Sequence, residues 1–389
     1  MVVLRKILAV MMTVVLLAMA CPVPVGGQEA VPPTVSARGA VLMECSTGRV
    51  LMAVNEKEHL AMASTTKIMT ALLTLELGDP KEEITVTDEM VRVEGTAMGL
   101  RAGDTVNMES LAVGMLLPSG NDAAMAAAIT LGGSLEGFAQ LMNERAQEIG
   151  CEDTNFVTPS GLDAEEHYSC AYDMALIARE AMKNPTFASI ASSKTAKATF
   201  GNPPQERTLS NHNRLLRMYD GAIGVKTGFT KKAGRCLVSC AERDGVRLIA
   251  VTLNDGNDWK DHGAMFDYGF SLLSTQSLPP VPDITLPVVG GNEQSQLLRV
   301  VAQDVPSATL LPDEFDQLER TIQLPRFVYA PVKVGDLLGK AVYTLNGQPV
   351  AQTDLIAAEG VEYEPPKSAW EKFCGFWQWI WDGIAGLFS

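Results

Sequence analysis

The sequence is short of positive charge. Its 31 lysines and arginines face 46 aspartates and glutamates, which gives a formal net charge of -15 at pH 7. A nucleic-acid backbone would repel such a chain, so we exclude nucleic acid as a partner. Histidine is scarce as well, and the four histidines show no metal-ligand spacing (His59, His167, His212 and His262). The sequence therefore predicts no metal site.

Cysteine motifs and several common catalytic motifs are also missing. The seven cysteines form no C-x-x-C pair and no regular framework, which excludes a zinc-ribbon site and a disulfide-rich scaffold. The patterns G-x-S-x-G and H-E-x-x-H are absent. The stretch GVKTG is not a Walker A loop, because Val225 rather than glycine precedes Lys226. We expect no cofactor.

The N-terminus carries an export signal. Two basic residues precede the apolar run ILAVMMTVVLLAMA, which ends in small residues. This pattern predicts a secretory signal peptide over residues 1–20, and the run is short for a membrane-spanning anchor. Cys21 follows directly, but Ala18 stands where lipoproteins usually carry leucine, so lipidation is less favoured. A Pro/Gly-rich linker occupies residues 21–34, and we expect the protein to be exported.

Residues 35–276 have the pattern of one mixed domain. The stretch ARGAVLMECSTGRVLMAVNE near its start predicts two strands around a turn, and residues 222–254 predict three more. Helical patterns dominate between them, from residue 64 to about 190. Strands at both ends of a helical middle predict an α/β (α+β) fold, with helices packed on an antiparallel sheet of distant segments.

Residues 277–364 predict a small all-β domain. The segments are short, β-rich and separated by turns, and Asn346-Gly347 is a strong hairpin signal. We find no catalytic constellation in this part of the sequence. Its role stays open.

The tail, residues 366–389, has the pattern of an amphipathic membrane-anchor helix. It is too short and too polar to span a membrane comfortably, but tryptophan-rich apolar faces favour the membrane interface. A core helix or an oligomer seam is the alternative. The apolar side chains that recur at helical spacing are Trp370, Phe373, Trp377, Ile380, Trp381, Ile384 and Phe388.

The stretch MASTTKIMTALL holds the first candidate for chemistry. Ser64 suits a helix N-cap, and Lys67 lies three residues later, where side chains on a helix are neighbours. A serine hydroxyl needs a base, and a lysine can serve only if its pKa falls. Burial lowers a lysine pKa, as do a neighbouring lysine and the positive end of a helix. Alone, however, S-x-x-K is a weak signal.

Two further motifs strengthen the first. Ser119-Gly120-Asn121 lies in LLPSGNDAA, and Lys226-Thr227-Gly228 lies in GVKTGFT. Taken alone, Ser119-Gly120-Asn121 is equally typical of a plain turn, and Lys226-Thr227-Gly228 is equally typical of a hairpin end. S-x-x-K, S-D-N and K-T-G in this order are the signature of penicillin-binding proteins and class A β-lactamases, and here the middle motif is S-G-N.

With these motifs, the chain resembles a low-molecular-mass penicillin-binding protein, a serine-type D-alanyl-D-alanine carboxypeptidase of peptidase family S11. FVTPSGLD, HYSCAYDMALIAR and GVKTGFTKKAGRCLVS also match the pattern of that family. The resemblance implies a β-lactamase/transpeptidase-like fold, followed by a β domain and an amphipathic anchor. It implies removal of the terminal D-alanine from peptidoglycan pentapeptides at the outer face of the cytoplasmic membrane, and inhibition by β-lactams.

The resemblance implies four catalytic residues. Ser64 would be acylated and release D-alanine, with Lys67 as its base. Ser119 would relay a proton to the leaving amine. Asn121 would hold the substrate amide and orient Lys67.

It also implies a substrate-binding strand. Lys226 and Thr227 would bind the terminal carboxylate of the substrate, and Gly228 completes that motif. The backbone N–H groups of Ser64 and Phe229 would form the oxyanion hole. Two departures leave substrate detail open, Ile223 in place of an acidic residue and Cys170 in place of threonine.

Two other functions compete. A class A-like β-lactamase would also need a glutamate to activate water; Glu152, Glu165 and Glu166 fall in the right interval, but no Glu-x-x-Leu-Asn arrangement is present. A catalytically inactive wall-binding protein is the other alternative, and the intact motifs argue against it. The preferred stem peptide, side activities and oligomeric state stay open.

Overall fold

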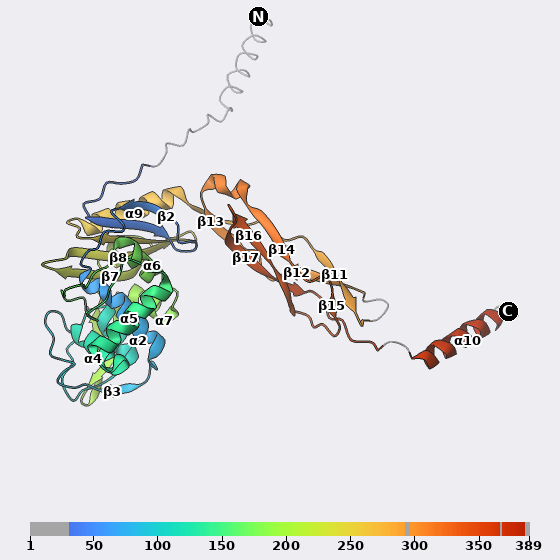
Figure 1. Ribbon diagram of the computed structural model, residues 1–389, viewed down its shortest axis with the longest axis horizontal. Coiled ribbons are helices and arrows are strands. Elements are labelled where there is room, and N and C mark those ends of the chain that lie inside the picture. The colour runs from blue at the N-terminus through green and yellow to red at the C-terminus, as the bar shows by residue number, and fades with distance from the viewer. Residues whose placement is uncertain (1–30, 292–295, 366–367, 386–389) are drawn as a thin grey trace, which may run out of the picture.

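The computed structural model describes residues 31–291, 296–365 and 368–385. The predicted signal peptide, Cys21 and most of the predicted linker lie outside these residues. Figure 1 shows a rounded body at the N-terminal side, an elongated β body and a separate C-terminal helix.

The rounded body is built around a five-stranded antiparallel sheet. The strand order is β2-β1-β9-β8-β7, so the first two strands of the chain pair with the last three of this body. The predicted sheet of distant segments is therefore confirmed. Its strands are β1 (Gly39–Glu44), β2 (Val50–Val54), β7 (Ala222–Thr230), β8 (Gly234–Arg243) and β9 (Val246–Leu253).

Both faces of this sheet are covered. Val41 and Met43 face the larger helical layer, whereas Ala40 and Leu42 pack with α9 (Asp258–Leu272) on the other side. The two sets alternate because successive side chains of a strand point to opposite faces. Burial on both faces explains why β1, β8 and β9 read as nearly continuous apolar runs.

The helical layer carries the remaining elements of this body. A second, four-stranded sheet with the order β3-β4-β5-β6 lies beside it and was not predicted from the sequence. The helices are α2 (Lys67–Leu77), α3 (Met108–Leu116), α4 (Asn121–Gly132), α5 (Leu135–Ile149), α6 (Ala171–Ala181), α7 (Pro185–Ser192) and α8 (Leu215–Met218). The small-sheet strands are β3 (Glu83–Thr85), β4 (Thr105–Asn107), β5 (Thr195–Gly201) and β6 (Pro204–Ser210).

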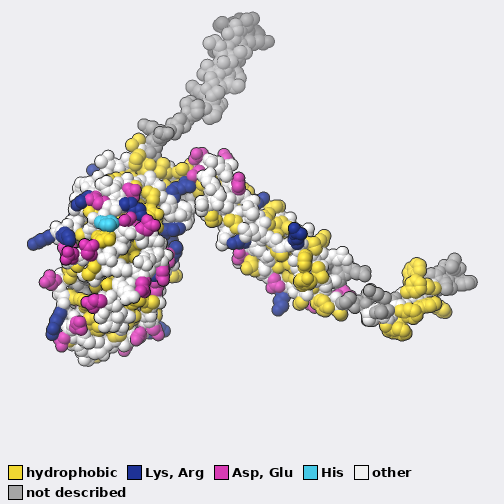
Figure 2. Space-filling model, in the orientation of Figure 1, with side chains coloured by type: hydrophobic (Ala, Val, Ile, Leu, Met, Phe, Trp, Pro, Cys, Tyr) yellow, Lys and Arg dark blue, Asp and Glu magenta, His cyan; other side chains and the backbone are white. Residues whose placement is uncertain are grey.

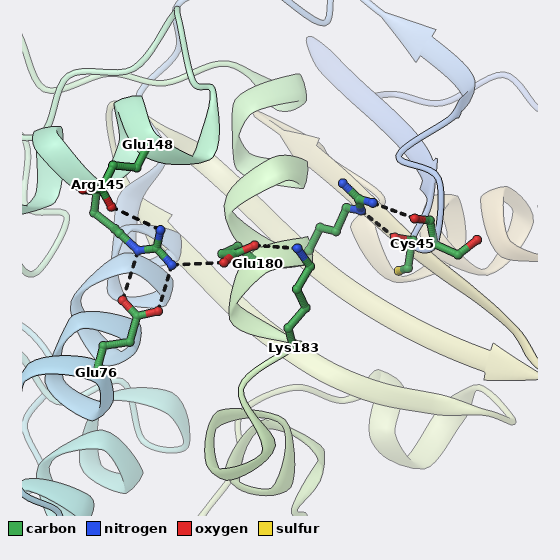
Figure 3. Close-up of polar contacts among 8 residues, drawn as sticks. Cys45, Glu76, Arg145, Glu148, Glu180 and Lys183 are labelled. Carbon is green, nitrogen blue, oxygen red and sulfur yellow. Dashed lines mark hydrogen bonds and ion pairs between the residues drawn. The ribbon is translucent and has the colours of Figure 1, made fainter. Parts of the chain in front are cut away.

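An ion-pair network ties three of these helices together (Figure 3). The Arg145 guanidinium of α5 donates to both carboxylate oxygens of Glu76 on α2, at 3.0 and 2.9 Å, and to Glu180 on α6 at 3.0 Å. Lys183 donates to the other oxygen of Glu180. Partly exposed pairs of this kind contribute little each, but the network fixes the C-terminal end of α2.

The second body consists of β strands. Its main sheet has the order β14-β16-β17-β12-β11-β15, and β10 (Ser274–Ser277) pairs with β13 (Ser307–Leu310). Asn346 and Gly347, both at positive φ, form the predicted hairpin turn between β16 and β17. The main-sheet strands are β11 (Ile284–Val289), β12 (Leu297–Ala302), β14 (Glu319–Gln323), β15 (Val328–Tyr329), β16 (Leu337–Leu345) and β17 (Gln348–Ala357).

The C-terminal segment forms helix α10 (Ala369–Ala385), as predicted; Phe388 lies outside the described residues. Trp370, Trp379 and Trp381 are each more than 70 % exposed, so α10 is not a core helix of this chain. Among the described residues, no helix has the length and hydropathy to cross a membrane.

Candidate active site

Ser64 lies in a tight turn that leads into α2. Ala63–Thr66 form a 3₁₀ turn, and α2 starts at Lys67. The expectation that Ser64 caps the helix is therefore wrong: the N-cap is Thr66, which makes no side-chain capping bond. The i, i+3 neighbourhood is confirmed, since Lys67 Nζ lies 3.0 Å from Ser64 Oγ.

Lys67 is fully buried and has a second polar contact. Its Nζ donates to the carbonyl oxygen of Ser160 at 2.6 Å. Ser160 belongs to the TPSGLD segment, whose neighbouring carbonyl, that of Pro159, accepts a hydrogen bond from Thr70 of α2. The sequence singled out this segment but did not indicate that its backbone holds the lysine.

The pKa of Lys67 is held well below its usual value. The largest cause is burial, which disfavours the charged amine, and the second is the positive charge of Lys226. Asp122 acts in the opposite direction. The sequence indicated burial and a neighbouring lysine as causes, and in the structure burial is the larger of the two. Because no carboxylate contacts Nζ among the described residues, the amine is stabilised in its neutral form.

The Ser119-Gly120-Asn121 motif lies at the start of α4, under the loop of residues 94–100. Ser119 has φ 64°, and its carbonyl accepts a hydrogen bond from Thr96 Oγ1 at 2.6 Å. The buried carboxylate of Asp122 accepts three backbone N–H groups of the loop, from residues 98–100. Asp122 was not predicted, although an acidic residue in the first turn of a helix is the available signal.

Asn121 does not hydrogen-bond to Lys67 in this structure. Its Nδ2 donates to the carbonyl of Glu94, and its Oδ1 is buried without a partner among the described residues. The orienting contact to Lys67 comes from Ser160 instead. The predicted role of Asn121 toward the substrate amide stays a prediction, and its free acceptor oxygen is suited to it.

Strand β7 carries the third motif directly beside the serine. A Cβ added to Gly228 would lie 3.0 Å from the backbone nitrogens of Ser64 and Thr65, so a larger residue here would press on the serine turn. β7 is the edge strand of the main sheet. Phe229, next along the strand, is 65 % exposed.

Lys226 is buried on the same strand. Its Nζ donates to the Thr227 carbonyl at 2.7 Å, and burial lowers the pKa of Lys226 to about 7. Burial lowers the pKa of His212, and the nearby charge of Lys226 lowers it further. The structure thus brings Ser64, Lys67, Gly228 and Lys226 together around one turn.

His167 has a structural role in the site. Its Nδ1 accepts the N–H of Val157 at 3.0 Å, which leaves Nε2 to donate to Thr66 Oγ1 at 3.0 Å. Burial lowers the pKa of His167 to about 4, so the ring is neutral near pH 7. The histidine joins the TPSGLD segment to the turn that carries Ser64.

Comparison with known proteins decides the family. A model of the S11 family, D-alanyl-D-alanine carboxypeptidase, matches residues 27–257. The chain belongs to this family. A second model, for the C-terminal domain of penicillin-binding protein 5, matches residues 285–363 of this S11 chain. The resemblance inferred from the motifs is confirmed.

Relatives and solved structures agree with this assignment. The D-alanyl-D-alanine carboxypeptidase DacF of Bacillus subtilis is 32% identical, over 84% of this chain and 86% of its own length. DacC of Escherichia coli is 33% identical, over 90% and 88%. Penicillin binding protein 5 of Haemophilus influenzae aligns with a TM-score of 0.61 at 27% identity, over 85% and 99%. The Streptomyces K15 DD-transpeptidase aligns with 0.59 at 32%, over 62% and 100%. The transpeptidase-like fold is confirmed.

Gly161 is a further residue on which the S11 site depends. Its φ is +81°, and an added Cβ would lie 1.9 Å from the carbonyl oxygen of Ala63. Gly161→Ala should therefore displace the turn beside Ser64 and slow acylation by penicillin about 100-fold. Gly150→Ala is the control, because Gly150 has a similar φ of +96° but open space around it. Equal acylation rates in both variants, measured by stopped-flow or gel labelling, would contradict this role.

A second polar cluster lies away from Ser64. Asp153, Cys170 and Asp173 could together offer metal ligands. However, the Lys57 ammonium lies 3.2 Å from Asp153 and 4.0 Å from Asp173, and supplies the positive charge there. Cys170 also caps α6, since its sulfur accepts the N–H of Asp173. The thiol therefore fills the capping position where the family often has threonine.

Proposed function

We propose that the chain removes the terminal D-alanine from peptidoglycan pentapeptides through an acyl-enzyme on Ser64. The observation that carries this proposal is a buried Lys67, with a depressed pKa, 3.0 Å from the serine oxygen. A neutral amine has one lone pair and two hydrogens. It can give a hydrogen to the Ser160 carbonyl and take the Ser64 proton on its lone pair.

The remaining residues act at successive steps of the reaction. Ser64 Oγ attacks the carbonyl carbon of the penultimate D-alanine, and the N–H groups of Ser64 and Phe229 stabilise the oxyanion. Ser119 passes a proton to the nitrogen of the leaving D-alanine, and water then hydrolyses the ester. Asn121 Oδ1, a buried acceptor without a partner in the described part of the chain, receives the substrate amide N–H.

Strand β7 supplies the recognition of the substrate. Its outer edge is unpaired in the sheet, so an extended peptide can lie along it. Lys226, when protonated, and Thr227 bind the terminal carboxylate. Gly228 leaves room for the close approach of the strand to the serine turn.

The β-lactamase alternative is less well supported. Glu152, Glu165 and Glu166 are all exposed, and none of their carboxylates hydrogen-bonds to Ser64 or Lys67 among the described residues. A carboxylate that activates water would have to lie next to Lys67. The Ser160 carbonyl occupies that position instead. A penicilloyl ester on Ser64 should therefore be long-lived.

One experiment separates the three candidate functions. The purified chain is incubated with a diacyl-D-Ala-D-Ala peptide and, separately, with penicillin. A carboxypeptidase releases D-alanine and accumulates a penicilloyl adduct. Rapid penicillin turnover without D-alanine release would indicate a β-lactamase. A wall-binding protein without activity would give neither product nor adduct.

The pH dependence of kcat/KM follows from the two lysines. At low pH Lys67 becomes protonated and cannot act as base, so the rate rises as pH rises through its depressed pKa. Above about pH 7 Lys226 loses the charge that binds the substrate carboxylate, so the rate falls. Lys226→Arg keeps its charge at all these pH values and should lose the falling limb. A falling limb that is unchanged in this variant would contradict the assignment.

We also propose that the protein is exported and bound peripherally to the outer face of the cytoplasmic membrane through α10. The exposed aromatic side chains of α10, with the Phe373 ring in contact with those of Trp370 and Trp377, support an interfacial position. Loss of this anchor would leave a secreted enzyme.

Deleting residues 366–389 tests the anchor. The truncated protein should appear in the soluble fraction with full D-alanine release, because no described residue of α10 contributes to the site. Fractionation of membranes, followed by the D-alanine assay, measures both properties. Membrane retention of the truncated protein would place the anchor at the N-terminus.

A further inference from the structure

The elongated β body exposes an apolar surface at its far end. Figure 2 shows hydrophobic side chains gathered on the part of this body that leads toward α10. Four large side chains define this surface, which we name the distal patch. They are Val289 (47 % exposed), Leu297 (59 %), Phe327 (44 %) and Tyr329 (69 %).

Strand register places the distal patch on one side of the sheet. Val289 pairs with Tyr329 across the β11–β15 bridge, and Leu297 pairs with Pro287, two residues before Val289. Phe327 contacts Tyr329 edge-on, with ring centroids 5.3 Å apart. The intervening residues Val288 and Val328 pack into the core of the β body. The outward side of β11, β12 and β15 is thus apolar at this end of the sheet, whereas the next outward pair, Thr285 and Arg299, is polar and exposed.

The chain leaves the β body beside this patch. The Glu364 N–H donates to the Gly290 carbonyl at 2.8 Å, one residue beyond Val289. The Tyr363 ring lies against Gly290 and is 55 % exposed, which extends the aromatic surface. α10 begins five residues later at Ala369. Five residues reach at most about 18 Å, so the patch is held close to the start of that helix.

We propose that the distal patch is a second membrane-contact surface, which enters the lipid interface beside α10. The inference rests on the interfacial position proposed for α10. Tyrosine is suited to that depth because it joins an apolar ring to a polar hydroxyl, and phenylalanine can bury its ring at the boundary of the acyl chains. The exposed Arg326 and Lys333 on either side of Phe327 and Tyr329 can contact anionic headgroups.

With both α10 and the distal patch in the membrane, the β body would be held in one orientation. A single amphipathic helix on a short linker leaves the body above it free to turn, whereas a second contact fixes the β body against the bilayer. Because α10 holds the patch near the surface, the second contact is intramolecular and needs little intrinsic affinity. Membrane binding of the full chain should therefore exceed the binding given by the helix alone.

The test compares variants of the full chain on vesicles of phosphatidylethanolamine and phosphatidylglycerol. The double variant Val289→Ser, Tyr329→Ser should bind these vesicles about tenfold more weakly than the wild type, since two large side chains no longer enter the interface. Val305→Ser is the matched control: Val305 is 60 % exposed but lies next to β13, away from the patch, and its loss should not affect binding. D-alanine release should be unchanged in both variants because the site lies in the other body, and an unchanged far-UV circular dichroism melting curve checks that the β body stays folded.

Hydrogen exchange on the wild-type chain measures independently which segments the membrane protects. With vesicles, exchange should slow over residues 284–290 and 326–330 as well as over 369–385. Slowing over 369–385 alone, with wild-type binding by the double variant, overturns the distal patch and leaves the anchor intact. If exchange slows in none of the three segments, both the anchor and the distal patch are overturned. Slowing at the patch without vesicles, at high protein concentration, assigns it to a second copy of the chain and overturns the lipid contact.

Discussion

Ser64→Ala is expected to abolish both covalent labelling by penicillin and release of D-alanine. The variant lacks the only hydroxyl that contacts Lys67 among the described residues, so no ester can form. Fluorescent penicillin on a denaturing gel and a D-alanine assay measure the two losses.

Ser160→Ala is the matched control for this loss. Ser160 is the other serine beside Lys67, but it is buried and contacts the amine through its backbone carbonyl, which alanine keeps. The control should retain labelling and D-alanine release within a few-fold of the wild type. Covalent labelling of Ser64→Ala would refute Ser64 as the nucleophile.

Lys67→Ala is expected to slow acylation by about 100- to 10,000-fold, the usual contribution of a positioned general base. Ser64 would remain in its turn, because the turn is held by Gly161, His167 and β7 rather than by the lysine side chain. Acylation rates with excess penicillin, measured across pH, give the comparison. In the variant the rise of rate with pH that reports Lys67 should disappear.

Lys67→Met separates a catalytic loss from a folding defect. Lys67 is fully buried and has no carboxylate partner, so a methionine of similar length removes a group that is costly to charge in the interior. The melting temperature should stay the same or rise while acylation falls as in Lys67→Ala. Near-normal acylation by either variant would show that another group is the base.

The main features of the fold could be predicted because they depend on local patterns. The alternation of Val41 and Met43 with Ala40 and Leu42 is visible in the sequence, and so is the hairpin at Asn346-Gly347. The first and third motifs also indicated two of the segments that meet beside Ser64. The α10 helix was found from its aromatic spacing for the same reason.

The details that hold Lys67 depend on contacts between distant segments, and these have no local signal. The Ser160 carbonyl is 93 residues away in the chain, and any residue type would offer the same backbone oxygen. The close approach of Gly161 to Ala63 is likewise visible only once the two segments are packed. Ser64 resembled an N-cap because 3₁₀ turns and caps favour similar residues, and only the backbone geometry separates them.

The small sheet was missed for a related reason. Its strands β3 and β4 have three residues each, too few for an alternating pattern to stand out, and β4 pairs with β5 almost a hundred residues later. The same limit applies to Asp122, whose role depends on the loop of residues 94–100 folding over it.

The central claim is that a neutral Lys67 activates Ser64 to form an acyl-enzyme with the release of D-alanine. Acid quenching during turnover of a diacyl-D-Ala-D-Ala peptide, followed by peptide mapping by mass spectrometry, tests this claim most directly. We predict that the acyl group of the substrate, without its terminal D-alanine, is found on Ser64. D-alanine release with the acyl group on another residue, or cleavage at a different bond, would contradict it.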